Sequence, residues 1–238
     1  MEKENGGVIK YKLPILGKML RKRDNDGITQ FGKPSYSQYG EDILIEHLFP
    51  SVRSGCYLDL GSFDPFLFSN TAKLYENGWR GVNVDANPKS IKEFNKFRPE
   101  DKNLNFAIGL NESSKLNVYV FRDKTQTPCN TVNYDNAKRL ANIWGIDVPE
   151  PIAVPVVRLE TLMTKYFSGQ MVHILNIDLE TMDLDCLKSG NWTIHRPLLV
   201  LVEDGDFLFH DPMDSEIYKF MRSVGYVMPQ SRDRTGIK

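Results

Sequence analysis

The 238-residue sequence contains no apolar run near the ~20 residues that a membrane-spanning helix needs. Its 30 basic and 31 acidic residues leave a formal net charge of -1, which gives no overall attraction to nucleic acid or anionic lipid. The three cysteines lie far apart and form no CxxC pair, so neither a disulfide framework nor a zinc site is indicated. The first five residues do not read as a secretory signal. These absences favour a globular protein of the reducing cytoplasm.

Residues 1–34 differ from the rest of the chain because basic side chains there accompany a small apolar group. We interpret this stretch as a basic N-terminal extension and residues 35–238 as one domain. The extension either lies on that domain or docks weakly on a membrane surface or a partner as a short amphipathic helix. Its apolar face is too small for firm membrane binding.

From Tyr36 onward, apolar strand patterns alternate with helical ones. The strands are continuous apolar runs, which is typical of strands buried on both faces. The sequence therefore predicts an α/β fold with a mostly parallel sheet and helices on both faces. We expect helices over 38–49, 71–76, 134–144, 162–167, 183–188 and 216–224, and a further one that Asn87 caps before Pro88. We expect strands over 57–60, 81–85, 104–108, 116–121, 156–159, 172–177, 197–202 and 226–228.

Acidic residues follow several of these strands. In an open parallel sheet, ligands bind beyond the carboxyl ends of the strands. The acidic residues expected there are Asp59, Asp85, Asp178, Glu180, Glu203, Asp204 and Asp206. Taken singly, each reads most simply as a loop or helix cap, but the set in this order favours a nucleoside site.

Asp85 and the turn that begins at Gly61 limit the kind of nucleoside. An acid at the end of the second strand accepts hydrogen bonds from a ribose diol. A diphosphate needs close backbone approach and several glycines, whereas this turn reads Gly-Ser-Phe-Asp-Pro. Bulk and negative charge there are compatible with S-adenosylmethionine, which carries a ribose and a positive sulfur but no phosphate.

Four segments together resemble the successive motifs of the FkbM family of S-adenosylmethionine-dependent methyltransferases. They are YSQYGEDILIEHLF, GCYLDLGSFDPFLFSNTAKLYENGWRGVNVDANP, NIDLETMDLDCLKSGNW and RPLLVLVEDG. The resemblance implies a class I, Rossmann-like methyltransferase fold. It also implies O-methylation, often of a sugar hydroxyl in a polysaccharide or natural product, with a small-molecule or glycan acceptor.

The resemblance also implies site residues. The expected cofactor contacts are Gln38, Glu41, Asp59, Gly61, Phe63, Asp64, Asn70, Asp85, Ala86 and Asp178. The family's Asp-x-Glu-Gly motif falls on Asp178 to Thr181, so a threonine replaces a glycine and the backbone there is expected to turn less freely. The family's last two strands are matched only by residues 226–228 and a polar tail, which predicts an incomplete sheet edge or a shortened chain.

Methyl transfer to a hydroxyl needs a base to accept the proton. The candidates at the right end of the sheet are Asp178, Glu180, Glu203 and His210. Asp178 and Glu180 are also oxygen ligands for a possible divalent cation, while a helix-capping role for Glu180 stays open. His210 follows the fifth strand of the sheet and is either a base or a solvated loop residue.

Two other functions remain open at this point. A nicotinamide-dependent sugar oxidoreductase or epimerase predicts a G-x-G-x-x-G turn, which is absent. A methyltransferase-like domain that binds without turnover is compatible with Thr181 and the short C-terminus. A nucleic-acid methyltransferase is disfavoured because the charge is balanced and there is no Asn-Pro-Pro-aromatic motif.

Overall fold

The computed structural model describes residues 33–112, 115–121, 130–205 and 207–228. The strands are β1 (Cys56–Leu60), β2 (Arg80–Asp85), β3 (Lys102–Asn105), β4 (Ala107–Ile108), β5 (Lys115–Val118), β6 (Ile152–Val157), β7 (Ile174–Ile177) and β8 (Leu199–Val202). The helices are α2 (Glu41–Leu48), α3 (Ala72–Glu76), α4 (Pro88–Phe97), α5 (Tyr134–Trp144), α6 (Leu159–Phe167), α7 (Asp183–Lys188) and α8 (Glu216–Ser223), with a 3₁₀ turn, η2 (Pro212–Asp214). Within these ranges no helix has the length and apolar character that a membrane crossing requires. The predicted N-terminal extension lies almost wholly outside the described residues.

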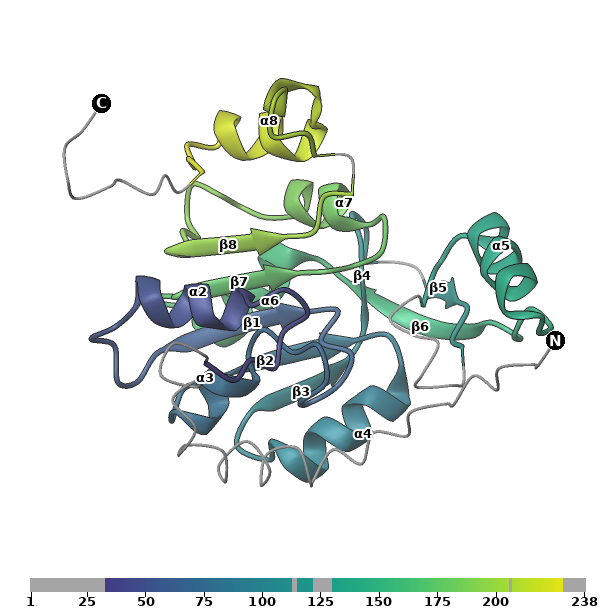
Figure 1. Cartoon of the computed structure of the whole chain (residues 1–238), viewed down its shortest axis with the longest axis horizontal. Helices are drawn as coiled ribbons and strands as arrows, with labels where there is room; N and C mark the ends of the chain where they lie inside the picture. Colours follow the sequence, from purple (N-terminus) through teal and green to yellow (C-terminus); the bar gives the residue numbers. More distant parts are fainter. Residues whose placement is uncertain (1–32, 113–114, 122–129, 206, 229–238) are drawn as a thin grey trace, which may run out of the picture.

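Five parallel strands form the main sheet in the order β3-β2-β1-β7-β8 (Figure 1). Alternate side chains of each strand point to opposite faces. One face packs against α2 through a cluster around Ile45, Tyr57 and Trp79. The other face carries the largest cluster, in which Leu58 and Leu175 pack with residues of α6, α7 and α8. The predicted α/β fold, with helices on both faces of a parallel sheet, is confirmed.

Local sequence explains where several helices begin. Asn87 caps α4, because its side chain accepts a hydrogen bond from the backbone N–H of Lys89 at 3.0 Å, and Pro88 takes the first helical position. Ser215 caps α8 in the same way through the N–H of Tyr218 at 2.9 Å. These caps fix the directions in which the chain leaves the sheet.

A row of polar side chains crosses four adjacent strands of the main sheet. Asn103, Asn83, Asp59 and Asn176 are register partners in that order. The Asn83 amide donates to the side chain of Asn103 at 2.8 Å, and the Asn176 amide donates to Asp59 at 2.9 Å. All lie on the face that carries Tyr57, and we call them the polar row. Its position places Asp59 and Asn176 just below the carboxyl ends of their strands.

A smaller sheet stands beside the carboxyl ends of the main sheet, in the order β4-β6-β5 (Figure 1). The predicted strand over 156–159 is wrong in its boundaries, because β6 begins at Ile152 and α6 already begins at Leu159. Pro155 lies within β6, opposite Lys115 at the end of the ladder with β5. Helix α5 packs on this sheet through Phe121 and Ala137.

The predicted last strand over 226–228 is wrong. Tyr226 instead turns onto Trp192, with ring centroids 5.5 Å apart, and its hydroxyl donates to the carbonyl of Pro197 at 2.7 Å. Its backbone N–H closes the end of α8 by bonding to the carbonyl of Met221 at 2.9 Å. Because tertiary contacts fix Tyr226 in this way, β8 is an edge strand within the described part of the chain.

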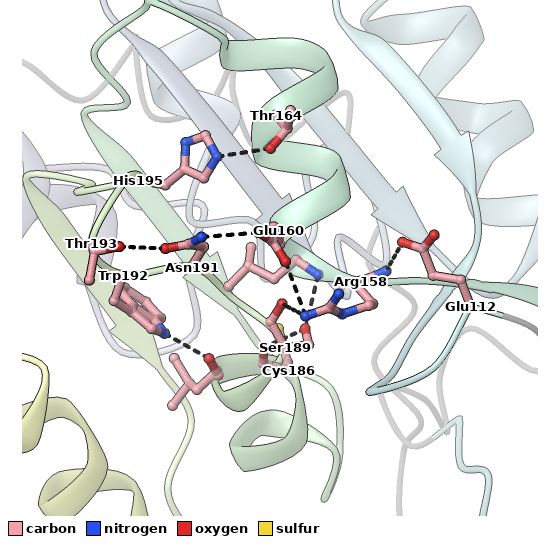
Figure 2. Close-up of polar contacts among 12 residues, drawn as sticks. Glu112, Arg158, Glu160, Thr164, Cys186, Ser189, Asn191, Trp192, Thr193 and His195 are labelled. Carbon is pink, nitrogen blue, oxygen red and sulfur yellow. Dashed lines mark hydrogen bonds and ion pairs between the residues drawn. The ribbon is translucent and has the colours of Figure 1, made fainter.

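Polar contacts from the segment after α7 hold the start of α6 (Figure 2). Ser189 accepts the N–H of Leu159 through its hydroxyl at 2.9 Å and the N–H of Glu160 through its carbonyl at 3.2 Å. Further along the helix, the Thr164 hydroxyl and the Nε2 atom of His195 are 3.0 Å apart. These bonds provide external capping for a helix that lacks a side-chain cap of its own.

Candidate active site

A cleft with about 950 Å³ of free space, partly open to solvent, lies where β1, β2 and β7 end and the smaller sheet begins. The structure brings many of the predicted site residues together there. Those that line the cleft are Gln38, Asp59, Gly61, Phe63, Asn70, Asp85, Ala86, Asp178 and Glu180. This is the edge of a parallel sheet at which ligands bind.

The other predicted site residues do not line the cleft. Glu41 accepts the N–H of Tyr39 at the start of α2. Asp64 caps a turn by accepting two backbone N–H groups at 3.0 Å, so it shapes the loop after β1. Glu203 follows β8 and is hydrogen-bonded to Asp178, and His210 lies exposed beyond it.

Gly61 is required by the close approach of two strand ends. Its φ is +79°, and a Cβ atom at this position would lie 1.7 Å from the carbonyl oxygen of Asp178. Its N–H bonds to the carbonyl of Val84 at 2.9 Å, so the turn stays attached to β2. The glycine therefore lets the chain cross between β2 and β7 and opens the floor of the cleft.

Asp85 fastens the loop after β1 to the end of β2. One carboxylate oxygen accepts the N–H of Phe63 at 2.8 Å and the other accepts the N–H of Asn87 at 2.6 Å. Burial raises the pKa of Asp85 to about 6, and these hydrogen bonds oppose the rise. Each oxygen keeps a second lone pair, so the carboxylate suits a ribose diol in the cleft.

Four carboxyl groups gather where β7 and β8 end. Burial, followed by the charge of Glu203 and a hydrogen bond to it, raises the pKa of Asp178 to about 8. Burial and the charges of Glu203 and Asp183 raise the pKa of Glu180 to about 7, and the charge of Arg139 opposes this. Such groups exchange protons near neutral pH, which is what a general base in this position requires.

The divalent cation remains a prediction. Within the described ranges, no three side chains of His, Cys, Asp or Glu are arranged to hold a metal ion. The two predicted metal ligands are Asp178, which is hydrogen-bonded to Glu203, and Glu180, two residues further along the chain.

Backbone strain is concentrated at the cleft. Of the described residues other than glycine, those with positive φ are Phe63 (52°), Phe68 (56°), Glu180 (49°) and Thr181 (94°). The first three line the cleft and Thr181 follows Glu180. Thr181 thus adopts a glycine-like conformation despite its branched side chain. Such strain persists where the surrounding structure enforces it, commonly at functional sites.

Sequence reasoning missed several residues that shape the cleft. Asp183 accepts the N–H groups of Leu179 at 2.9 Å and Thr181 at 3.2 Å, and so closes the strained turn. Asn176 donates to Asp59 at 2.9 Å and accepts from the Asn70 amide at 2.9 Å. The signal for Asn176 was an amide within a buried apolar strand, because such a group needs partners.

The residues that line the cleft fit S-adenosylmethionine. They include Asp59, Asp85, Asp178 and Glu180, and none of the described lining residues is lysine, arginine or histidine. An acidic surface without cationic side chains attracts a sulfonium and repels a diphosphate. The lone pairs of Asp85 suit a ribose diol, and Gly61 permits a close approach to the carbonyl of Asp178 that a Cβ atom would prevent.

Comparison with models of protein families matches residues 59–228 to the methyltransferase FkbM domain. The chain has no match among curated proteins. The matched range includes Asp59, Gly61, Asp85, Asp178 and Glu180, and it covers most of the chain, so the resemblance seen in the sequence motifs is confirmed. The protein belongs to the FkbM family of methyltransferases.

Proposed function

We propose that the protein is an S-adenosylmethionine-dependent O-methyltransferase that acts on a sugar hydroxyl of a glycan or natural product. The observation that carries the proposal is that Asp178 and Glu180, at the end of β7, line the cleft together with Asp85, while Glu203 is hydrogen-bonded to Asp178. A carboxylate whose pKa is about 8 is a far stronger base than an ordinary one. It therefore matches a hydroxyl nucleophile, which must lose its proton as the new bond forms.

The lining of the cleft supports a neutral acceptor. Amide and hydroxyl groups of Gln38, Asn130 and Thr131 stand beside Phe63 and the partly exposed Phe68. These are groups that hydrogen-bond to sugar hydroxyls and pack against sugar rings. The negative charge of the cleft disfavours phosphorylated acceptors and nucleic acid. We place the protein in the cytoplasm, where S-adenosylmethionine is made.

In this proposal, S-adenosylmethionine supplies an electrophilic methyl group on its positively charged sulfur. Asp85 binds and orients the ribose, and Gly61 lets the loop after β1 approach the end of β7 closely. Asp178 accepts the proton of the acceptor hydroxyl, and the protonated carboxyl then donates a hydrogen bond to Glu203. Alignment of the hydroxyl with the methyl group is the main contribution expected from the protein.

The test combines binding with turnover. Titration calorimetry should show micromolar binding of S-adenosylmethionine and S-adenosylhomocysteine, weakened at least about tenfold by Asp85→Ala. Release of S-adenosylhomocysteine is then measured with a panel of sugars, amines and carboxylic acids, with magnesium and with EDTA. Asp178→Asn should weaken cofactor binding by no more than about fivefold and lose more than about 100-fold in turnover, as expected for a base.

Each other outcome has a definite meaning. Methylation of amines or carboxylates alone would overturn the sugar O-methyl assignment. Unchanged turnover in Asp178→Asn would remove the carboxyl pair as the base. Cofactor binding with no product from any acceptor would favour the domain that binds without turnover.

A further inference from the structure

Arg98, which follows α4, is completely buried. It is the largest side chain among those fully removed from solvent in the described part of the protein. Burying a charged guanidinium is costly unless hydrogen bonds and charges compensate it. Its position at a helix end gives no reason for this burial, because a cation there is normally solvated. The contacts of the guanidinium therefore indicate what the burial achieves.

Within the described residues, the hydrogen-bond acceptors of the Arg98 guanidinium all lie in one loop. Nη1 donates to the hydroxyl of Thr71 at 2.8 Å. Nη2 donates to the hydroxyl of Ser69 at 2.8 Å and to the carbonyl of Pro65. These residues belong to the connection between β1 and α3, here called the cofactor loop (residues 61–71). The planar fork of arginine suits this grip because its donors have fixed relative directions.

Thr71 connects Arg98 to Asp59, which lines the cleft. Its hydroxyl donates to Asp59 at 2.6 Å, and the other oxygen of Asp59 accepts from Asn176 at 2.9 Å. Asn176 in turn accepts from the amide of Asn70 at 2.9 Å. The chain of bonds thus starts and ends in the cofactor loop. Asp59, Asn70 and Asn176 all line the cleft, whereas Arg98 does not.

The charge of Arg98 also acts on Asp59. Burial raises the pKa of Asp59, and the hydrogen bonds from Thr71 and Asn176, together with the charge of Arg98, oppose that rise. The buried cation and the buried carboxylate share the Thr71 hydroxyl as their bridge. Removing the cation would leave the carboxylate without a compensating charge and the loop without its anchor.

Helix α4 connects both attachments of the cofactor loop. At its start, Asp85 and Asn87 are joined by a hydrogen bond of 2.6 Å, and Asp85 also holds the N–H of Phe63. At its end, Arg98 holds the far part of the same loop. The helix has 10 residues, which corresponds to about 15 Å. One rigid element therefore sets the spacing between the ribose-binding acid and the rest of the loop.

We infer that Arg98 is a positioning residue, which holds the cofactor loop in the shape that binds S-adenosylmethionine without touching the cofactor itself. This rests on the proposed use of the cleft for S-adenosylmethionine. The alternative is that Arg98 supports only the stability of the fold. The two roles differ in what happens to cofactor affinity when the protein remains folded.

The experiment measures cofactor affinity and melting temperature together. Arg98→Met should raise the Kd for S-adenosylmethionine at least about tenfold, and Thr71→Val should raise it in the same direction. Thr71→Ser keeps the bridging hydroxyl and should restore near wild-type affinity. Hydrogen exchange of residues 61–71 should accelerate in the first two variants and not in Thr71→Ser.

Tyr57→Phe is the matched control. Tyr57 is equally buried and its hydroxyl donates to Asp101 at 2.5 Å, with no hydrogen bond to residues 61–71 among the described contacts. It should lower the melting temperature and leave the Kd within about twofold. If Arg98→Met does not fold, the Thr71 pair carries the comparison.

Two results would overturn the inference in different ways. No binding to the wild type would remove the proposed function and this inference together. If the wild type binds S-adenosylmethionine and Arg98→Met and Thr71→Val bind it equally well, only the positioning role is removed. The same holds if Tyr57→Phe weakens binding as much as they do.

Discussion

Thr181 gives the sharpest test of the strain at the cleft. Its φ of +94° lies in a region that glycine adopts freely and a β-branched residue rarely adopts. Its side chain is exposed, and its N–H bonds to Asp183 at 3.2 Å. Thr181→Ala and Thr181→Gly both keep that backbone hydrogen bond and both remove the hydroxyl and methyl groups. The two variants therefore differ only in the Cβ atom.

The expected magnitude follows from two opposing effects. Holding a residue with a Cβ atom at positive φ costs about 1–2 kcal/mol. Glycine loses roughly 0.5–1 kcal/mol through the greater freedom of the unfolded chain. Thr181→Gly should therefore be more stable than Thr181→Ala by about 1 kcal/mol. For a protein of this size, that difference corresponds to a rise in melting temperature of roughly 2–4 °C.

Calorimetric or denaturant unfolding of both variants measures the difference. Thr193 provides the control position, because it is also exposed and does not have positive φ. At Thr193 the order should reverse, with alanine more stable than glycine by roughly 0.5–1 kcal/mol. An alanine variant at Thr181 that is more stable than the glycine variant by roughly 0.5–1 kcal/mol, as at Thr193, would show that the turn is not strained.

Four further predictions concern the cleft and the core. Gly61→Ala should abolish cofactor binding, because its Cβ would meet the carbonyl of Asp178. Gly169→Ala is the control: its φ is +70° and no atom lies within 4 Å of the added Cβ, so it should cost about 1–2 kcal/mol of stability and keep binding. Calorimetry compares cofactor binding by the two variants, and equal binding would contradict the close approach of Gly61 to Asp178. The preference for S-adenosylmethionine over S-adenosylhomocysteine should grow about fivefold or more between pH 6 and 8.5, because the raised pKa values of the cleft carboxyl groups delay their ionisation until that range; a ratio independent of pH would contradict it. Because the pKa of Asp178 is raised to about 8, the stability of the wild type should fall as pH rises from about 4 to 8. Asp178→Asn should therefore be more stable than the wild type by about 1–3 kcal/mol at pH 8 and show no gain at pH 4. Denaturant unfolding at both pH values tests the direction of this pH dependence. The Nδ1 atom of His173 accepts the N–H of Cys56 at 3.2 Å, and burial lowers the pKa of His173. Stability should therefore fall as pH decreases below about 6.5, and His173→Gln should reduce that loss. A pH profile of stability that is the same in His173→Gln and the wild type would contradict this role of His173.

The sequence predicted those parts of the fold that local patterns determine. Helix α4 follows from Asn87 and Pro88, and α7 from the periodicity over 183–188. The parallel sheet follows from the buried apolar runs, but its strand order depends on how helices pack across it. Tyr226 illustrates the limit, because its local pattern favoured a strand and its packing on Trp192 prevails.

The candidate site divides in the same way. Acidic residues after the strands were found because the carboxyl ends of parallel strands meet at one edge. Arg98 was not found, since in the sequence it reads as an ordinary cation after a surface helix. Its role depends on the stacking of α4 beside the cofactor loop, which only the three-dimensional structure shows. Asp64 stays a predicted cofactor contact, and the structure adds that it accepts two backbone N–H groups of its own loop.

The polar row has a consequence for how the sheet assembles. Alternating burial selects which side chains face inward, yet a strand displaced by two residues would satisfy that requirement equally well. Such a displacement would place Asp59 beside Ile174 rather than Asn176 and leave a buried carboxylate without its amide. An unpaired buried group of this kind costs about 1–3 kcal/mol or more. The row therefore favours the native register over one displaced by two residues, through the same carboxylate and amide that line the cleft.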